Sequence, residues 1–267
     1  NTAITMLLGG NFGTSAANAA ATNGGVILSG GYDVFDAAGT GIAATPGSTT
    51  AVDIAMGNTV FGTKLVGITT GKIDGSPAPA GVLEFDGAAS LTGTKGVSLV
   101  ADLDETITAK SDLTLTSPAF ATLRLGTDNA AGAKPNPASV TVAGNLGINA
   151  SVEGLDAAVV AAGGRATLQL DAGAVTPQLT VKGLTTLEAD GKGAEGPGSG
   201  GGGRGGVAQL LVNGGTATLA GISVHAQGTG ANATGSGNGG SGTGGIVALT
   251  LGTGTILSTT GGEMHAD

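Results

Sequence analysis

The stretch that decides the fold is Gly163-Gly-Arg-Ala-Thr-Leu-Gln-Leu-Asp-Ala-Gly173, which returns as Gly205-Gly-Val-Ala-Gln-Leu-Leu-Val-Asn-Gly214 and as Gly244-Gly-Ile-Val-Ala-Leu-Thr-Leu-Gly-Thr-Gly254. The three copies start 42 and 39 residues apart. A second block, Val140-Thr-Val-Ala-Gly144, returns at similar spacing as Leu179-Thr-Val-Lys-Gly183 and Ala217-Thr-Leu-Ala-Gly221. Repetition at a fixed period of this size is typical of solenoids and other repeat architectures. We therefore expect a unit of about 38 residues that recurs roughly four times.

Each unit carries the periodicity of β-strands. Apolar residues alternate with polar ones over three to five positions, as in Leu168 and Leu170 or Leu249 and Leu251, and a period of two residues indicates a strand. Gly pairs between the runs suit turns, because Gly adopts positive φ without steric cost. Only Asp156 to Ala162 is a candidate for a short helix. The sequence therefore predicts an all-β fold.

Two Gly-rich stretches, Gly191 to Gly206 and Gly228 to Gly245, occupy the same place in successive units. Without them a unit keeps about 22 residues, which suits one coil of three short strands. Examples are Leu179 to Val181, Thr186 to Glu188 and Ala208 to Val212. A single coil cannot hide its apolar side chains, so coils stack around a narrow core. We predict a parallel β-helix (β-solenoid) with Gly-rich loop insertions, which either stack as a shelf along the solenoid or act as flexible linkers.

The first part of the chain is less regular. We interpret residues 1–105 as an irregular all-β region, a set of degenerate coils or a cap, and residues 106–267 as the repetitive β-solenoid. Ser76 to Ala80 is the expected boundary within the first half. The strand candidates in this part are Val26 to Leu28, Val52 to Ala55, Leu65 to Ile68, Val82 to Phe85 and Val97 to Val100.

Composition excludes several classes of function. The 267 residues include 54 Gly but no Cys, no Trp and one Tyr, and the net charge is −9. Nucleic acid needs clustered cations, whereas the ten Lys and Arg residues are scattered singly. No apolar run reaches the roughly 18 residues that span a bilayer. We expect no nucleic-acid partner, no membrane span and, with so few side chains suited to chemistry, no enzyme activity.

Three local patterns resemble catalytic or ligand-binding motifs. Asp102, Asp104 and Glu105 could ligate calcium or form an acid–base pair, but such clusters are usually solvated turns. Gly30-Gly-Tyr-Asp33 approaches a calcium-binding nonapeptide only once, where tandem copies are needed. Gly57-Asn-Thr-Val-Phe-Gly-Thr-Lys64 lacks the Lys-Ser/Thr order and the following helix of a phosphate-binding loop. We therefore predict no catalytic, cofactor-binding or metal-binding residues, and no cofactor.

His225 and His265 are the only histidines. Their offset of 40 residues is close to the repeat length, so they could stack in adjacent coils. No Cys is present to join them as metal ligands. We expect both histidines at the surface rather than in a metal site.

The second half resembles the parallel β-helix surface proteins of bacteria, the autotransporter passengers and filamentous-haemagglutinin-like adhesins. The residues that carry the resemblance are the run from Val140 to Val152 and the repeated Gly-Gly-x-Ala-x-Leu-x-Leu blocks. The resemblance covers about 150 residues and implies secretion, an elongated shaft and an adhesive role. Because the chain starts at Asn1, we expect a mature form or a fragment.

Three functions stay open at this point. An extracellular structural protein, a subunit of a surface filament, fibre or lattice, would self-associate through open solenoid ends, because unpaired strand edges template further pairing. An adhesin shaft would be a monomeric rod that binds a host or environmental surface. A β-helix enzyme acting on polysaccharides would need a carboxylate-lined groove near Asp102. The acidic, aromatic-poor composition favours the first two, at a bacterial cell surface or in a phage fibre.

Overall fold

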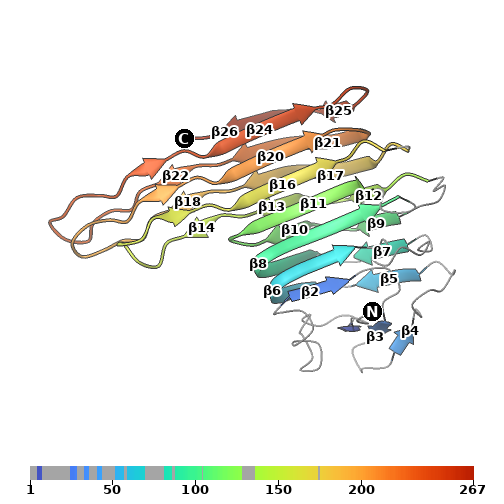
Figure 1. Cartoon of the computed structure of the whole chain (residues 1–267), viewed down its shortest axis with the longest axis horizontal. Coiled ribbons are helices and arrows are strands. Elements are labelled where there is room, and N and C mark those ends of the chain that lie inside the picture. Colours follow the sequence, from blue (N-terminus) through green and yellow to red (C-terminus); the bar gives the residue numbers. More distant parts are fainter. Residues whose placement is uncertain are drawn as a thin grey trace.

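The computed structural model describes strand segments at 5–7, 25–28, 33–35, 41–43, 52–56, 59–69 and 81–85, and the chain over 88–103, 105–127, 136–173 and 175–267. Within these residues every regular element is a β-strand and none is a helix. Figure 1 shows the strands stacked in successive layers from the N-terminal to the C-terminal part of the chain. The predicted all-β fold class is confirmed.

Most strands belong to three ladders of parallel pairs. The first ladder contains β2 (Gly25–Leu28), the second halves of β6 (Thr59–Thr69) and β8 (Ala89–Asp102), β11 (Phe120–Thr127), β16 (Arg165–Leu170), β20 (Val207–Val212) and β24 (Ile246–Leu251). The second contains β5 (Val52–Met56), β7 (Gly81–Phe85), β9 (Glu105–Ala109), β12 (Ser139–Val142), the first halves of β17 (Gln178–Glu188) and β21 (Thr216–His225), and β25 (Ile256–Thr259). The third contains the first halves of β6 and β8, β10 (Leu113–Thr116), β13 (Leu146–Asn149), the second halves of β17 and β21, and β26 (Gly262–His265).

The remaining strands form three small sheets. One combines β1 (Thr5–Leu7), β3 (Asp33–Phe35) and β4 (Gly41–Ala43), with β3 and β4 antiparallel. A second combines β14 (Val152–Glu153), β18 (Gly191–Lys192) and β22 (Gly228–Thr229). The third combines β15 (Ala161–Ala162), β19 (Gly203–Arg204) and β23 (Gly242–Thr243).

The register of the ladders follows the sequence repeat. Val142 pairs with Val181 and Val181 with Leu219, which are the equivalent positions of the second sequence block. The predicted strand candidates at 26–28, 52–55, 65–68, 82–85 and 97–100 all fall within strands. Strands β17 and β21 each serve two ladders, and β17 changes register between Val181 and Leu184. The sequence predicts two separate strands at 179–181 and 186–188, whereas the structure has one strand, β17, with an irregularity between them.

The core is a narrow column of aliphatic side chains. In the first ladder, Leu123, Leu168 and Leu210 are register partners in successive layers and are fully buried. The second ladder has an equivalent column of register partners, Val140, Leu179 and Ala217, whose side chains are at most 1% exposed. The largest fully buried side chains are leucines and an isoleucine, Leu91, Leu99, Leu103 and Ile107. Layers this thin cannot bury their apolar residues alone, so each layer is stabilised by its neighbours.

The Gly-rich stretches are ordered and stacked. Together with residues 151–164 they form three layers, 151–164, 190–206 and 227–245, which we call the arm and which project to one side of the ladders (Figure 1). Backbone hydrogen bonds join the layers, such as Gly193 N to Thr229 O at 2.8 Å and Gly203 N to Ser241 O at 2.9 Å. A Cβ atom on Gly203 would collide with the carbonyl oxygens of Gly191 and Thr229. The backbones therefore approach to distances that leave no room for side chains.

The predicted helix at Asp156 to Ala162 is wrong. The Asp156 carboxylate accepts a hydrogen bond from Ala158 N at 2.8 Å, and the Asp156 carbonyl accepts one from Val159 N at 3.1 Å. These bonds close a turn at the end of the first arm layer, and β15 follows directly. Asp favours such side-chain to backbone turns over the helix interior.

The predicted internal boundary at Ser76 to Ala80 lies outside the described residues. The ladders run across residue 105, since β7 pairs with β9 and β8 pairs with both β10 and β11. The division of the chain into 1–105 and 106–267 stays a prediction.

Candidate functional site

The last layer of the ladders, formed by β24, β25 and β26, is more exposed than the layer that precedes it. Leu168 and Leu210 are fully buried, whereas their register partner Leu249 is 45% exposed. Val212 is fully buried, whereas its partner Leu251 is 52% exposed. The core columns thus continue into this layer and become accessible there.

The other strands of the last layer repeat this pattern. Met264 is 44% exposed, although its register partner Val224 is fully buried. Val247 and Leu257 are only partly buried and pack against the core. Among the described residues, β24 pairs with β20, and β25 and β26 pair with β21. We call this surface, with Leu249, Leu251 and Met264 at its centre, the terminal face.

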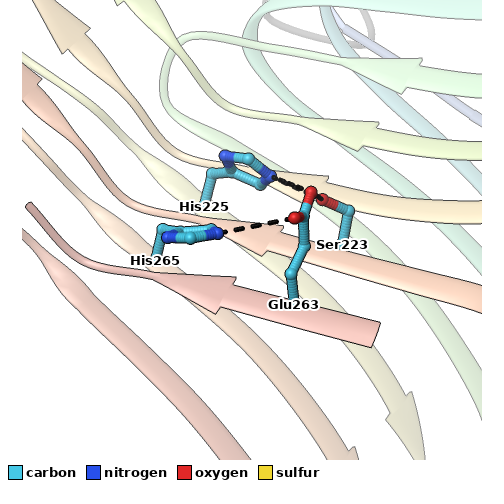
Figure 2. A network of polar contacts seen from close by, with 4 residues as sticks. All are labelled: Ser223, His225, Glu263 and His265. Carbon is cyan, nitrogen blue, oxygen red and sulfur yellow. Dashed lines mark hydrogen bonds and ion pairs between the residues drawn. The ribbon is translucent and has the colours of Figure 1, made fainter. Parts of the chain in front are cut away.

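A polar network borders the terminal face. Ser223 and His225 lie on β21, and their register partners Glu263 and His265 lie on β26 (Figure 2). The Ser223 hydroxyl donates to Glu263 Oε1 at 2.8 Å, and His225 Nε2 lies 2.5 Å from the same hydroxyl. A hydroxyl has one proton, so when Ser223 donates it to Glu263 the contact with His225 requires His225 Nε2 to be the donor. The network therefore ties the last layer to the preceding one.

Glu263 is the centre of this network. His265 Nε2 lies 3.5 Å from Glu263 Oε2, and the two histidine rings have centroids 5.4 Å apart. The hydrogen bond from Ser223, followed by that from His265, lowers the pKa of Glu263 below its usual value of 4.5. Hydrogen bonds to the ionised form stabilise the charge. Glu263 is therefore a carboxylate at neutral pH.

The network does not have the geometry of a nucleophilic triad. In a triad, the histidine accepts the serine proton and an acid orients the other ring nitrogen. Here the Ser223 proton points at a carboxylate whose lowered pKa makes it a weak base. No group of three or more His, Cys, Asp and Glu residues in the described part of the chain could hold a metal ion. The arrangement is suited to joining layers rather than to catalysis.

The structure brings the two histidines together, as their spacing predicts. His225 and His265 are direct register partners, and their side chains are 24% and 43% exposed. Sequence reasoning missed Ser223 and Glu263. The signal was available, since Glu263 follows Ser223 by the same 40 residues that separate the histidines.

The other candidate motifs lie partly outside the described residues. Asp102 ends β8 and Glu105 begins β9, while Asp104 lies outside the described residues. The segment resembling a phosphate-binding loop is a strand from Thr59 onwards, because β6 continues to Thr69. In Gly30-Gly-Tyr-Asp33, only Asp33 falls within the described strands.

Comparison with known proteins gives no relative. No family model matches the chain, and no curated protein or solved structure matches it. No described residue belongs to a helix long and apolar enough to cross a membrane.

Proposed function

We propose that this chain is an extracellular structural protein, a subunit of a surface filament or fibre. In this proposal the three ladders are the faces of a parallel β-helix, and a second copy of the chain covers the terminal face. The single observation that carries the proposal is the exposure of the core columns at Leu249, Leu251 and Met264. Unpaired strand edges with apolar side chains in register template further strand pairing.

The arrangement favours end-on growth over other contacts. Leu249 and Leu251 stand in the same columns as the buried Leu210 and Val212, so an added layer with alternating apolar residues would meet them as an internal layer does. In the same ladder β2 pairs with β6, and no described strand pairs with its other edge. Association between different ends of the same molecule is heterologous and gives filaments when it does not close.

Sedimentation velocity of the 267-residue chain over a range of concentrations tests this proposal, with negative-stain imaging of the same samples. We expect the mass to grow with concentration into rods or fibres, and Leu251→Asp to hold the chain as a monomer. Leu155→Asp is the matched control, because Leu155 is 99% exposed on the arm and lies away from the terminal face. A wild-type chain that stays monomeric would overturn the proposal, as would an equal effect of both substitutions.

The alternative of an adhesin shaft predicts the opposite sedimentation result. Monodisperse short rods at every concentration would support it and would direct the search to surface-binding assays. Secretion and a cell-surface location belong to both versions of the proposal.

A further inference from the structure

The outward side chains of the second ladder form a regular array of hydroxyl groups. Successive strands of this ladder place Thr108, Thr141, Thr180, Thr218 and Ser258 in one column as direct register partners. A parallel column two residues earlier holds Thr106, Ser139, Gln178, Thr216 and Ile256. All these side chains are half-buried or exposed. We call these ten positions the hydroxyl face.

The geometry of the array follows from the strand ladder. Neighbouring strands lie about 4.8 Å apart, and alternate residues of one strand lie about 6.7 Å apart. Thr has restricted χ1 freedom in a strand because its side chain is branched at Cβ. Hydroxyl and methyl groups therefore repeat in two directions on a surface fixed by the buried column of Val140, Leu179 and Ala217 beneath it.

Several outward polar side chains of the other two ladders make contacts within the protein. In the first ladder Arg124 Nε donates to Asp171 at 2.6 Å, and Gln209 Nε2 donates to Thr167 at 3.0 Å. In the third ladder Asn149 Nδ2 donates to Glu188 at 2.7 Å, and Ser223, His225, Glu263 and His265 form the network of Figure 2.

The hydroxyl face makes no such use of its polar groups. Over the described residues, no side-chain hydrogen bond engages the eight Ser and Thr hydroxyls of the face. The ten positions contain no charged residue and no aromatic residue. Lys110 and Lys182 are exposed at the edge of the face, two residues after Thr108 and Thr180. The second ladder thus carries two adjacent columns without charged residues, and eight of their ten positions hold a hydroxyl, in a chain whose net charge is −9.

These properties restrict the chemistry of a partner. A charged mineral or polyelectrolyte surface would call for charged side chains, and the face has none. Soluble sugars are usually held in concave sites lined with aromatic rings, and the face offers neither. A periodic, uncharged lattice of hydrogen-bonding oxygens fits best, because it can meet many hydroxyls at once with little ordering cost.

We propose that the hydroxyl face binds the surface of ice crystals. Ice presents rows of water oxygens that both donate and accept hydrogen bonds, as the Thr and Ser hydroxyls do. The methyl groups between the hydroxyls add apolar surface that can leave liquid water on docking. This binding is independent of the terminal face and of the proposed filament role.

Partition of the labelled chain into a slowly growing ice hemisphere tests the proposal. We expect the wild-type chain to be enriched in the ice fraction and to inhibit recrystallisation. Thr141→Lys and Thr180→Lys, at the centre of the face, should lose both effects. Thr122→Lys, an outward position of the first ladder, is the matched control and should behave as wild type. Circular dichroism and the thermal midpoint verify that all three variants fold.

The conservative variant Thr180→Ser keeps a hydroxyl and should retain the binding. Exclusion of the wild-type chain from ice would overturn the proposal, as would an equal loss with Thr122→Lys. A parallel pull-down with crystalline chitin and cellulose covers the nearest competing lattices. Retention on these solids without enrichment in ice would overturn the proposal in favour of a polysaccharide surface.

Discussion

Replacing Gly203 by alanine tests whether the arm is a packed structure held by backbone contacts. The new methyl group would collide with the carbonyl oxygens of Gly191, in the same layer, and Thr229, in the next layer. Both obstacles are backbone atoms that cannot rotate away, so the layers must separate. Overpacking of this kind costs about 1 to 3 kcal/mol. Because the arm lies beside the core, the cost should appear as local opening, with arm amide exchange about 5- to 150-fold faster.

Hydrogen exchange followed by mass spectrometry measures this effect in peptides that cover 190–206 and 227–245. Peptides from the core strand at 165–170 serve as the internal reference. Gly198→Ala is the control variant, since a Cβ atom at Gly198 meets nothing within 4 Å. It carries the same change in backbone entropy without the collision. Equal exchange rates in the two variants would refute the account of the arm as a stack of closely packed backbones.

Three further substitutions test the core and the terminal face. Thr185 is fully buried and its Oγ1 has no hydrogen-bond partner among the described residues, so Thr185→Val should raise the unfolding free energy by about 1 kcal/mol in urea denaturation. Leu210→Ala should cost about 2 to 5 kcal/mol, whereas Leu249→Ala, at 45% exposure, should cost about 1 kcal/mol in the monomer. The pKa of Glu263 is lowered by folding, so its contribution is present at neutral pH and lost as the pH falls below 4.5 through the folded pKa. The protection of the β26 amides relative to their intrinsic exchange rate at each pH should therefore fall in acid in the wild-type chain, and Glu263→Gln should remove that loss of protection.

The repeat in the sequence predicts the strand register in the second half of the chain. Val142, Val181 and Leu219 are equivalent positions of the second sequence block, and they are register partners in the structure. This success has a simple physical basis. When equivalent inward positions keep similar aliphatic side chains, one register buries them all. The change of register between Val181 and Leu184 could not be predicted, because Gly183 in this sequence reads equally well as a turn.

The order of the arm was not predictable from composition alone. Gly-rich sequence reads as flexible linker as readily as close backbone packing. The first arm layer, 151–164, is not Gly-rich, and its contact with the second layer depends on small residues such as Ala157. A Gly-rich stretch packs closely only where it lies directly above the same stretch of the neighbouring layer. This alignment depends on the register between layers and not on any single stretch of sequence.

The same argument explains why the polar surfaces could be interpreted only after the ladders were known. The role of a single Ser, Thr, His or Glu cannot be predicted from the sequence, because polar residues alternate with apolar ones in the strands of every ladder. Once Ser223 is opposite Glu263 and His225 is opposite His265, the four residues join two layers. Once Thr141 is opposite Thr108 and Thr180, the same kind of alternation leaves a column of hydroxyls without protein partners. The pairing of layers therefore decides whether a polar side chain stabilises the stack or remains available for binding. Substitutions at single positions can test which of these two roles a residue has.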